Sequence, residues 1–382
     1  MYAAKLALSI LQNRFRLTPR PLWCTFLVLY RCNARCPMCD SWRLKPGREL
    51  NPAQVRSVFR KLGPLQVVRL TGGEPFLRTD FAEIADSVMQ ESQPQVLHVT
   101  TNGSFPDRIR QFATEFSHPR KLQLLVSLDG LEEEHDRSRG PEVTYATAME
   151  SILQLLPLRK QGVSVSVNHT ISSPTSLHDH AELASRLLPL NVTLHAVIAY
   201  AESAMYSIKR VGTQASDLIM QSGYPLHPNL RDCDVVGFVH QRIKDAEKLP
   251  RIAERIAKRY YWTGLLSRLN NQSPPKLKPP CTTLRSHIRL LPDGSVPVCQ
   301  FNTEKVGNLL EQSLHDVWHS DTTRNQRHWV DRCSGCWAEC EVVPSALYSA
   351  DFLVQLAAGK LNPTAHPPGE SGRVWSGGKR DL

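Results

Sequence analysis

Three cysteines near the N-terminus have the types and spacing to hold an iron–sulfur cluster. Cys32, Cys36 and Cys39 stand in the run Cys-Asn-Ala-Arg-Cys-Pro-Met-Cys. Three thiolates leave a tetrahedral zinc ion one ligand short, so zinc would also need Asp40 or a distant histidine. They can instead hold three irons of a [4Fe–4S] cluster, which leaves the fourth iron open to a ligand that brings an amine and a carboxylate.

A second group of cysteines lies in the C-terminal third of the chain. Its members are Cys281, Cys299, Cys333, Cys336 and Cys340. One four-iron cluster needs four ligands, so this group exceeds the need of a single cluster by one. A structural zinc site built from the same cysteines is the alternative. Cys24 and Cys233 stand alone and are predicted to be ordinary core or surface thiols.

The elements that must position these cysteines are predicted from hydrophobic periodicity. Six apolar runs, at 25–30, 67–71, 96–101, 122–128, 163–170 and 192–199, read as strands buried on both faces. Amphipathic helices are predicted between them at 52–62, 81–91, 107–116, 143–159 and 177–188. The alternation implies an α/β protein with a parallel sheet. Six strands do not fill an eight-stranded barrel, so we predict a partial (β/α)6 TIM-like barrel with ligands at the carboxyl ends of its strands.

The rest of the chain is predicted to flank this core, which spans residues 22–200. Residues 1–21 are expected to form a basic N-terminal helix. Residues 201–280 comprise a helical insertion and a Pro-rich linker, and the two helices of the insertion should pack on the barrel or act as a substrate lid. Residues 281–345 are expected to form a small α+β cluster-binding domain that opens with a hairpin around Pro292-Asp293-Gly294. Residues 346–382 are expected to form a C-terminal helix and a disordered tail.

Polar or glycine-rich motifs end the first four predicted strands. The cysteine motif comes first, followed by Thr71-Gly72-Gly73-Glu74-Pro75, Thr101-Asn102-Gly103 and Ser127-Leu128-Asp129-Gly130. Two adjacent glycines let the backbone approach a ligand, and the exposed backbone carbonyls can accept hydrogen bonds from an ammonium group of that ligand. A tight strand-to-helix turn explains Gly-Gly-Glu-Pro alone equally well, but four motifs in order at strand ends are not chance.

These motifs together resemble the radical S-adenosylmethionine (SAM) superfamily, over about residues 22–345. The resemblance implies that Cys32, Cys36 and Cys39 hold a [4Fe–4S] cluster that binds SAM. It further implies reductive cleavage of SAM to methionine and a 5′-deoxyadenosyl radical, which abstracts hydrogen from a substrate. The cofactor carries this chemistry, and the protein positions it and excludes water.

The resemblance also implies a set of SAM contacts. Gly72, Gly73, Glu74 and Pro75 should cradle the methionine amine. Ser127, Asp129 and Asn102 should contact the ribose or the carboxylate, and Arg139 could pair with the carboxylate. Met38 stands where the family usually has an aromatic residue, and its backbone would contact the adenine. The family's glycine-rich motif of the fifth strand is missing.

The second cysteine group resembles the SPASM or shorter twitch extension of the same family. This likeness implies one auxiliary [4Fe–4S] cluster held by Cys281, Cys299, Cys333 and either Cys336 or Cys340. A cluster fully ligated by protein cannot bind substrate directly. It could instead take an electron from a substrate radical.

Charge and composition limit the partners. The net charge is +10, with nine Lys/Arg against one acid in residues 1–48 and eleven against five in residues 231–280. A solvated surface accounts for much of this charge, but it also suits docking of an acidic flavodoxin or ferredoxin. The sequence contains no run of about eighteen apolar residues, the length that a membrane-spanning helix needs, and no secretory signal is recognisable. A cytoplasmic, reducing compartment is therefore expected.

The substrate is left open between a peptide or protein and a small metabolite. Two alternatives of other classes stay beside this interpretation. One is a non-enzymatic zinc-binding module, and the other is an RNA-modifying radical SAM enzyme that binds RNA through residues 231–280, although the charge does not identify nucleic-acid binding. Its Tyr260, Tyr261 and Trp262 could stack on bases, but packing on the barrel is favoured. His135, His169, His195 and Tyr200 lie near strand ends, and none is assigned as catalytic.

Overall fold

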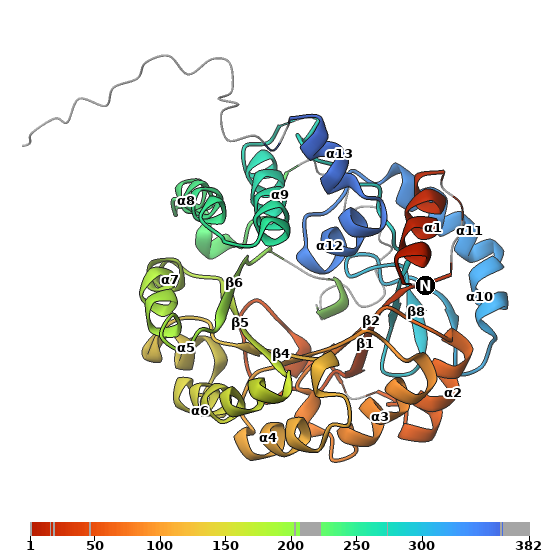
Figure 1. The fold of residues 1–382 in the computed structure, drawn as a ribbon, viewed down its shortest axis with the longest axis horizontal. Coiled ribbons are helices and arrows are strands. Elements are labelled where there is room, and N and C mark those ends of the chain that lie inside the picture. The colour runs from red at the N-terminus through yellow and green to blue at the C-terminus, as the bar shows by residue number, and fades with distance from the viewer. Residues whose placement is uncertain are drawn as a thin grey trace, which may run out of the picture.

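One open sheet of seven parallel strands organises the protein (Figure 1). The computed structural model describes residues 2–15, 17, 20–45, 47–201, 204–206, 223–272, 274–359 and 361. The strands are β1 (Trp23–Leu29), β2 (Val67–Gly72), β3 (Val96–Thr101), β4 (Leu122–Ser127), β5 (Ser164–Ile171), β6 (Thr193–Ile198) and β7 (His287–Leu290). They lie in the order β6-β5-β4-β3-β2-β1-β7. The described strands form no closed barrel, which confirms the predicted α/β partial barrel.

Six helices follow the barrel strands and cover the convex face of the sheet (Figure 1). They are α2 (Pro52–Leu62), α3 (Phe81–Ser92), α4 (Pro106–Glu115), α5 (Glu132–Arg139), α6 (Tyr145–Leu155) and α7 (Pro174–Leu187). The start of α2 shows why the sequence turns helical there. Asn51 caps it by accepting from the Gln54 backbone N–H, while Pro52 sits at the first helical position, where a missing N–H costs nothing.

The C-terminal region adds the seventh strand, which corrects the predicted hairpin. The tight turn at Gly294 is present, with Leu291 N–H donating to the Ser295 carbonyl over 2.9 Å. The two strands that flank the turn do not pair with each other, however. Before the turn, β7 pairs with β1 in parallel, and after it, β8 (Ser295–Pro297) pairs with β9 (Lys305–Asn308) in an antiparallel sheet. The free edge of β1 explains the difference, because pairing satisfies its backbone groups and buries all four residues of β7.

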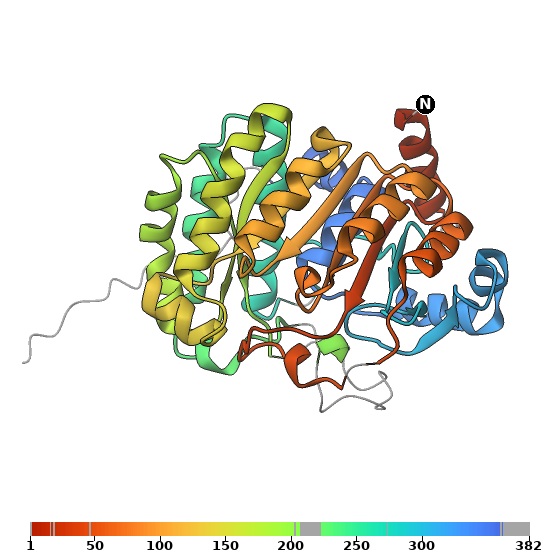
Figure 2. The same cartoon turned by 90° about the horizontal axis from the view of Figure 1, so that it is seen from below.

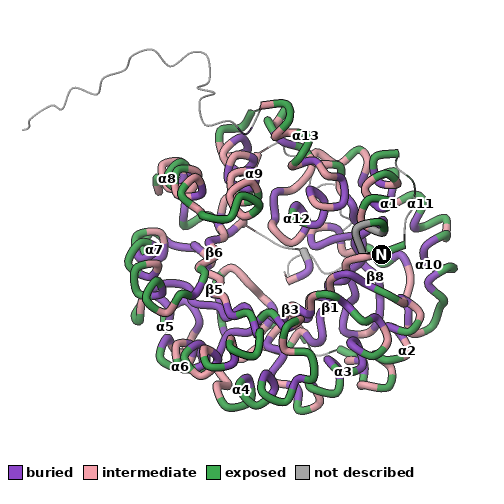
Figure 3. The backbone as a smooth tube through the Cα atoms, in the orientation of Figure 1, coloured by how far each residue is buried: buried purple, intermediate pink, exposed green. Residues whose placement is uncertain are grey.

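The buried residues, purple in Figure 3, include two large hydrophobic cores. The first fills the space between the sheet and helices α2, α3, α4, α6 and α7, and it extends into the C-terminal region. The second joins β5 and β6 to α8 (Val235–Glu247), α9 (Ile252–Leu269) and α12 (Glu339–Tyr348), so the insertion packs on the barrel as predicted. Tyr260, Tyr261 and Trp262 are at most 8% exposed in this core, against Trp337. They are therefore not free to stack on RNA bases.

The N-terminal helix lies beside one end of the sheet (Figure 2). Helix α1 (Tyr2–Arg14) contacts α12, where Asn13 Nδ2 donates to the Tyr348 carbonyl over 3.1 Å. The other C-terminal helices are α10 (Leu314–His319), α11 (Asp321–Arg332) and α13 (Asp351–Ala357). The predicted tail, from residue 362 on, lies outside the described residues. Among the described helices, none is long and apolar enough to cross a membrane.

Candidate functional site

A cavity of about 310 Å³ opens at the carboxyl ends of the barrel strands. All three cysteines of the first motif line it. So do six of the residues that the sequence assigns to SAM: Met38, Gly72, Gly73, Asn102, Ser127 and Arg139. The structure thus brings these site residues, which are up to about a hundred positions apart in the sequence, to one place. It does so because parallel strands end at one edge of the sheet.

The cysteine loop is held in place by hydrogen bonds from two neighbouring elements. Asn102, which follows β3, donates from Nδ2 to Asn33 Oδ1 over 2.8 Å, and the same nitrogen lies 4.0 Å from Cys32 Sγ. On the other side the Arg35 backbone N–H donates to the Arg139 carbonyl over 2.7 Å. Two anchors, one after β3 and one at the end of α5, thus hold the loop that carries the three thiols.

Burial keeps these thiols protonated in the metal-free chain. It raises the pKa of Cys32 and of Cys39 to about 12, and it raises the pKa of Cys36 as well, against a lowering by Arg139. Iron must therefore displace the thiol protons when it binds. Three thiols that line one cavity, which also admits a small ligand, fit a cluster with one open iron.

Two glycines let the turn after β2 approach the cysteine loop. Gly72 has φ of 132°, a conformation that residues with a side chain rarely adopt. A Cβ on Gly73 would overlap the Arg31 carbonyl oxygen, which lies at the start of the cysteine loop. The backbone of the turn can reach the cavity only because no side chain stands between.

Glu74 and Pro75 do not line the cavity. The Glu74 carboxylate is fully buried and accepts from Thr101 Oγ1 over 2.8 Å and from the Asn102 backbone N–H over 2.6 Å. Burial raises its pKa to about 7, although these hydrogen bonds oppose the rise. Glu74 thus ties the glycine turn to the end of β3, and its placement points to positioning rather than to direct contact with a ligand.

Asp129 likewise acts through another residue. It is fully buried, accepts from the Thr170 backbone N–H over 2.9 Å and pairs with Arg139 over 2.6 Å. Arg139 itself lines the cavity at the end of α5. The ion pair therefore presents a guanidinium to the cavity while the carboxylate stays behind it.

The three strand-end histidines are not among the residues that line the cavity, whereas Tyr200 lines it. His135 Nδ1 accepts from the Asp129 backbone N–H, His169 bonds to His180, and His195 Nδ1 bonds to Lys258. These partners explain them as buried structural groups. Tyr200 hydrogen-bonds with Gln300, which lines the cavity from the C-terminal region.

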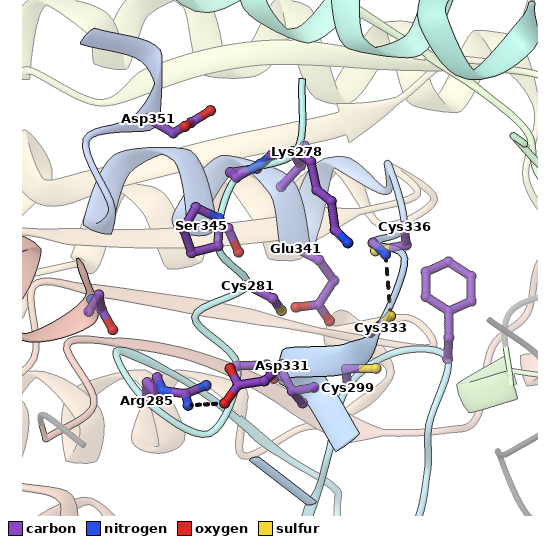
Figure 4. Close-up of a pocket in the computed structure, with 18 of the residues that line it drawn as sticks. Lys278, Cys281, Arg285, Cys299, Asp331, Cys333, Cys336, Glu341, Ser345 and Asp351 are labelled. Atoms are coloured by element: carbon purple, nitrogen blue, oxygen red, sulfur yellow. Dashed lines mark hydrogen bonds and ion pairs between the residues drawn. The ribbon is translucent and has the colours of Figure 1, made fainter. Parts of the chain in front are cut away.

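A second cavity, of about 510 Å³, lies in the C-terminal region (Figure 4). Its lining includes Cys281, Cys299, Cys333 and Cys336, and Figure 4 shows these four side chains around one space. Burial raises the pKa of each of these thiols. Among the described residues, no three Cys, His, Asp or Glu side chains converge closely enough for a single metal ion.

Cys340 is the fifth cysteine of this group, and it faces the barrel cavity instead. Its Sγ donates to Gln300 Oε1 over 2.5 Å, and burial raises its pKa while the nearby Arg289 lowers it. The next residue, Glu341, lines the second cavity, where its carboxylate accepts from Arg289 Nε over 2.8 Å. The start of α12 therefore forms a wall between the two cavities.

The two cysteine-lined cavities, one of them at the strand ends of an open parallel barrel, define an iron–sulfur enzyme. Residues 26–187 match the radical SAM superfamily, and residues 281–337 match the SPASM iron–sulfur cluster-binding domain. The chain thus carries a radical SAM domain followed by a SPASM domain. The first domain implies SAM and a [4Fe–4S] cluster as cofactors, and the second implies auxiliary iron–sulfur ligation. The SPASM match ends at residue 337 and so contains the four cysteines of the second cavity but not Cys340.

Similar proteins share only part of this chain. The GTP 3′,8-cyclase of Aquifex aeolicus is 29% identical over 180 residues, which is 44% of this chain and 53% of that protein. The mycofactocin maturase MftC of Mycobacterium tuberculosis is 31% identical over 172 residues, 44% of this chain and 42% of that protein. The chain thus covers about half the length of these curated relatives.

Solved structures support the fold over more of the chain. The structure of anSMEcpe with bound AdoMet superposes with a TM-score of 0.58 at 14% identity, covering 82% of this chain and 84% of that one. Streptococcus suis SuiB bound to its precursor peptide SuiA gives a TM-score of 0.54 at 14% identity, covering 85% and 70%. At this identity the likeness concerns the fold alone.

Proposed function

We propose that this chain cleaves SAM reductively in the barrel cavity and oxidises a substrate there, with an auxiliary cluster in the second cavity accepting an electron. The observation that carries the proposal is the start of α12, which gives Cys340 to one cavity and Glu341 to the other. When bound, the cluster and SAM supply a 5′-deoxyadenosyl radical that removes hydrogen from an unreactive C–H bond.

The chain's own residues have separate parts in this proposal. Cys32, Cys36 and Cys39 hold the first cluster, and Gly72 and Gly73 give the SAM amine access to backbone carbonyls. Arg139, oriented by Asp129, places a positive charge beside the loop for the SAM carboxylate. Ser127 and Met38 contribute further cavity surface for the nucleoside.

For the auxiliary cluster we propose the ligands Cys281, Cys299, Cys333 and Cys336. All four line one cavity, and the electrostatic effects on their thiols come in part from one another. Cys281 and Cys299 each raise the pKa of Cys336, and Cys333 raises that of Cys281. Cys340 lines the barrel cavity and not this one.

A peptide or protein is the substrate class that we propose first. The mycofactocin maturase and the peptide-bound SuiB structure support it, while the likeness to GTP 3′,8-cyclase keeps a small metabolite as the second candidate. We also propose an acidic flavodoxin or ferredoxin as the electron donor. Arg35 and Arg43, both exposed around Trp42 beside the cysteine loop, offer it a basic surface.

The proposal is tested by metal analysis and SAM cleavage after anaerobic reconstitution. Wild type should bind about eight irons and convert SAM to 5′-deoxyadenosine with dithionite, and the triple Cys32, Cys36, Cys39→Ala variant should keep about four irons and cleave none. Four irons in wild type and none in the variant, with zinc retained, would remove the auxiliary cluster from the proposal. Zinc alone in both proteins would favour a zinc-binding module and end the radical interpretation.

A further inference from the structure

We propose that the interior of the barrel holds a binding site for an anionic group of the substrate, a carboxylate or a phosphate, between Arg69 of β2 and Arg289 of β7. This proposal rests on the proposed function only in making the anion part of the substrate. The binding site itself follows from the charges and the strand register described below.

The strand register places the two arginines on one row of the sheet. Thr25 of β1 pairs with Arg69 on one side and with Arg289 on the other. In parallel strands, residues in register point to the same face, so all three side chains project from the concave face of the sheet. All three line the barrel cavity. A hydroxyl group thus lies between two guanidinium groups.

Arg69 brings a positive charge that the described part of the protein does not neutralise. Its Nε bonds to His98 Nδ1 at 3.4 Å, and no described carboxylate lies within ion-pair distance of it. His98 supplies no counter-charge. Burial and Arg69 together hold its pKa well below the ordinary value, so its imidazole stays neutral. A partly buried cation without a counter-charge is costly unless a ligand supplies the charge.

Arg289 supplies an unused hydrogen-bond donor at the same place. The residue is 2% exposed, and its Nε donates to Glu341. Its Nη2 is buried and has no hydrogen-bond partner. Guanidinium groups bind carboxylates and phosphates through paired N–H donors, so a bound anion would satisfy this nitrogen as well as the charge of Arg69.

The site is separate from the cation that we assign to SAM. Arg139 stands at the strand-end level, pairs with Asp129 and lies close enough to Cys36 to lower its pKa. Arg69 precedes Thr71 of the glycine turn by two residues, which sets it about 7 Å deeper in the barrel. Arg289 and Gln300 connect this deeper level to the wall of the auxiliary cavity through Glu341. A substrate anchored here would lie between the two proposed clusters.

Thermal unfolding of the reconstituted holoenzyme with inorganic phosphate or acetate as the probe tests the site. Against chloride at constant ionic strength, at least one probe should raise the unfolding midpoint of wild type by about 2 °C or more. Arg69→Gln should abolish the rise, and Arg110→Gln, which removes an exposed arginine of α4, should retain it. A rise with phosphate alone would identify a phosphoryl group, and a rise with acetate would identify a carboxylate.

Two controls keep the test decisive. Arg69→Lys retains the charge and should keep part of the rise even if Arg69→Gln folds poorly. SAM binding, measured by equilibrium dialysis, should change less than twofold in Arg69→Lys. No rise with either anion, or an equal rise in Arg69→Gln, would overturn the proposal. A tenfold loss of SAM affinity would also overturn it, because Arg69 would then serve the SAM carboxylate. None of these readouts requires turnover, so failure of the proposed function would be seen separately in the iron and SAM-cleavage assays.

Discussion

Single residues in this protein divide between those that face a cavity and those that position others. Glu74 and Asp129 belong to motifs that the sequence marks for SAM binding, yet both carboxylates are fully buried and bonded to neighbouring backbone or to Arg139. Cys336 and Cys340, four residues apart, face different cavities. The residue types predict the chemistry of the site. The direction of each side chain decides whether that residue lines a cavity or positions a neighbour.

The cysteine assignment makes a prediction at this scale. Cys336→Ala should lower the iron content from about eight to about four per chain or fewer, because it removes a ligand of the auxiliary cluster. Cys340→Ala, its matched control, should keep about eight. Iron analysis and the electron paramagnetic resonance spectrum of the reduced proteins measure both. Loss of the auxiliary signal in Cys340→Ala with retention in Cys336→Ala would reverse the assignment.

The glycine turn makes a second prediction. Gly73→Ala should lower stability by about 1–3 kcal/mol and weaken SAM binding, because its Cβ would overlap the carbonyls of Arg31 and Tyr30. Gly47→Ala is the matched control, since a Cβ there meets nothing within 4 Å. It should stay within about 0.5 kcal/mol of wild type. Chemical denaturation and equilibrium dialysis with SAM check the pair, and equal behaviour of the two variants would contradict the role of the turn.

At the scale of elements, periodicity did not reveal helix α5, and it did not reveal that the predicted strand at β7 pairs with β1. Helix α5 is polar throughout, with three glutamates in its first turn and two arginines in its last, a charge order that suits the helix dipole but leaves no apolar stripe. It nevertheless places Arg139 at the cavity. Strand β7 is only four residues long, and its place beside β1 depends on pairing with a strand more than 250 residues earlier.

At the scale of the whole molecule, buried neutral histidines link folding to pH. Burial is the first cause of a lowered pKa at each of them: His98 well below its ordinary value, His135 at about 4, and His169, His180 and His195 at about 3. In the unfolded chain they titrate near 6.5. Below that pH the unfolded state binds more protons than the folded state, so stability is lost as pH falls.

We therefore predict a steep loss of stability below about pH 6.5, each histidine contributing about 1.4 kcal/mol per pH unit at most. Glu74 opposes this in part, because its folded pKa of about 7 lies above its unfolded value and its protonation stabilises the fold as pH falls. Unfolding midpoints between pH 7.5 and 5 measure the slope, which His169→Gln should make shallower by about one proton. A slope unchanged in His169→Gln would show that this histidine does not contribute.

The sequence by itself determined the chemistry and the barrel of this protein. Its cysteine spacing, its strand-end motifs and its six βα units are local patterns, and local patterns persist in the folded chain because they arise from side-chain period and turn chemistry. The tertiary structure alone decided which fourth cysteine joins the second cavity, that β7 completes the sheet, and that Arg69 and Arg289 flank Thr25. Those facts depend on register between segments far apart in the chain, and register is fixed by long-range packing that no local pattern encodes.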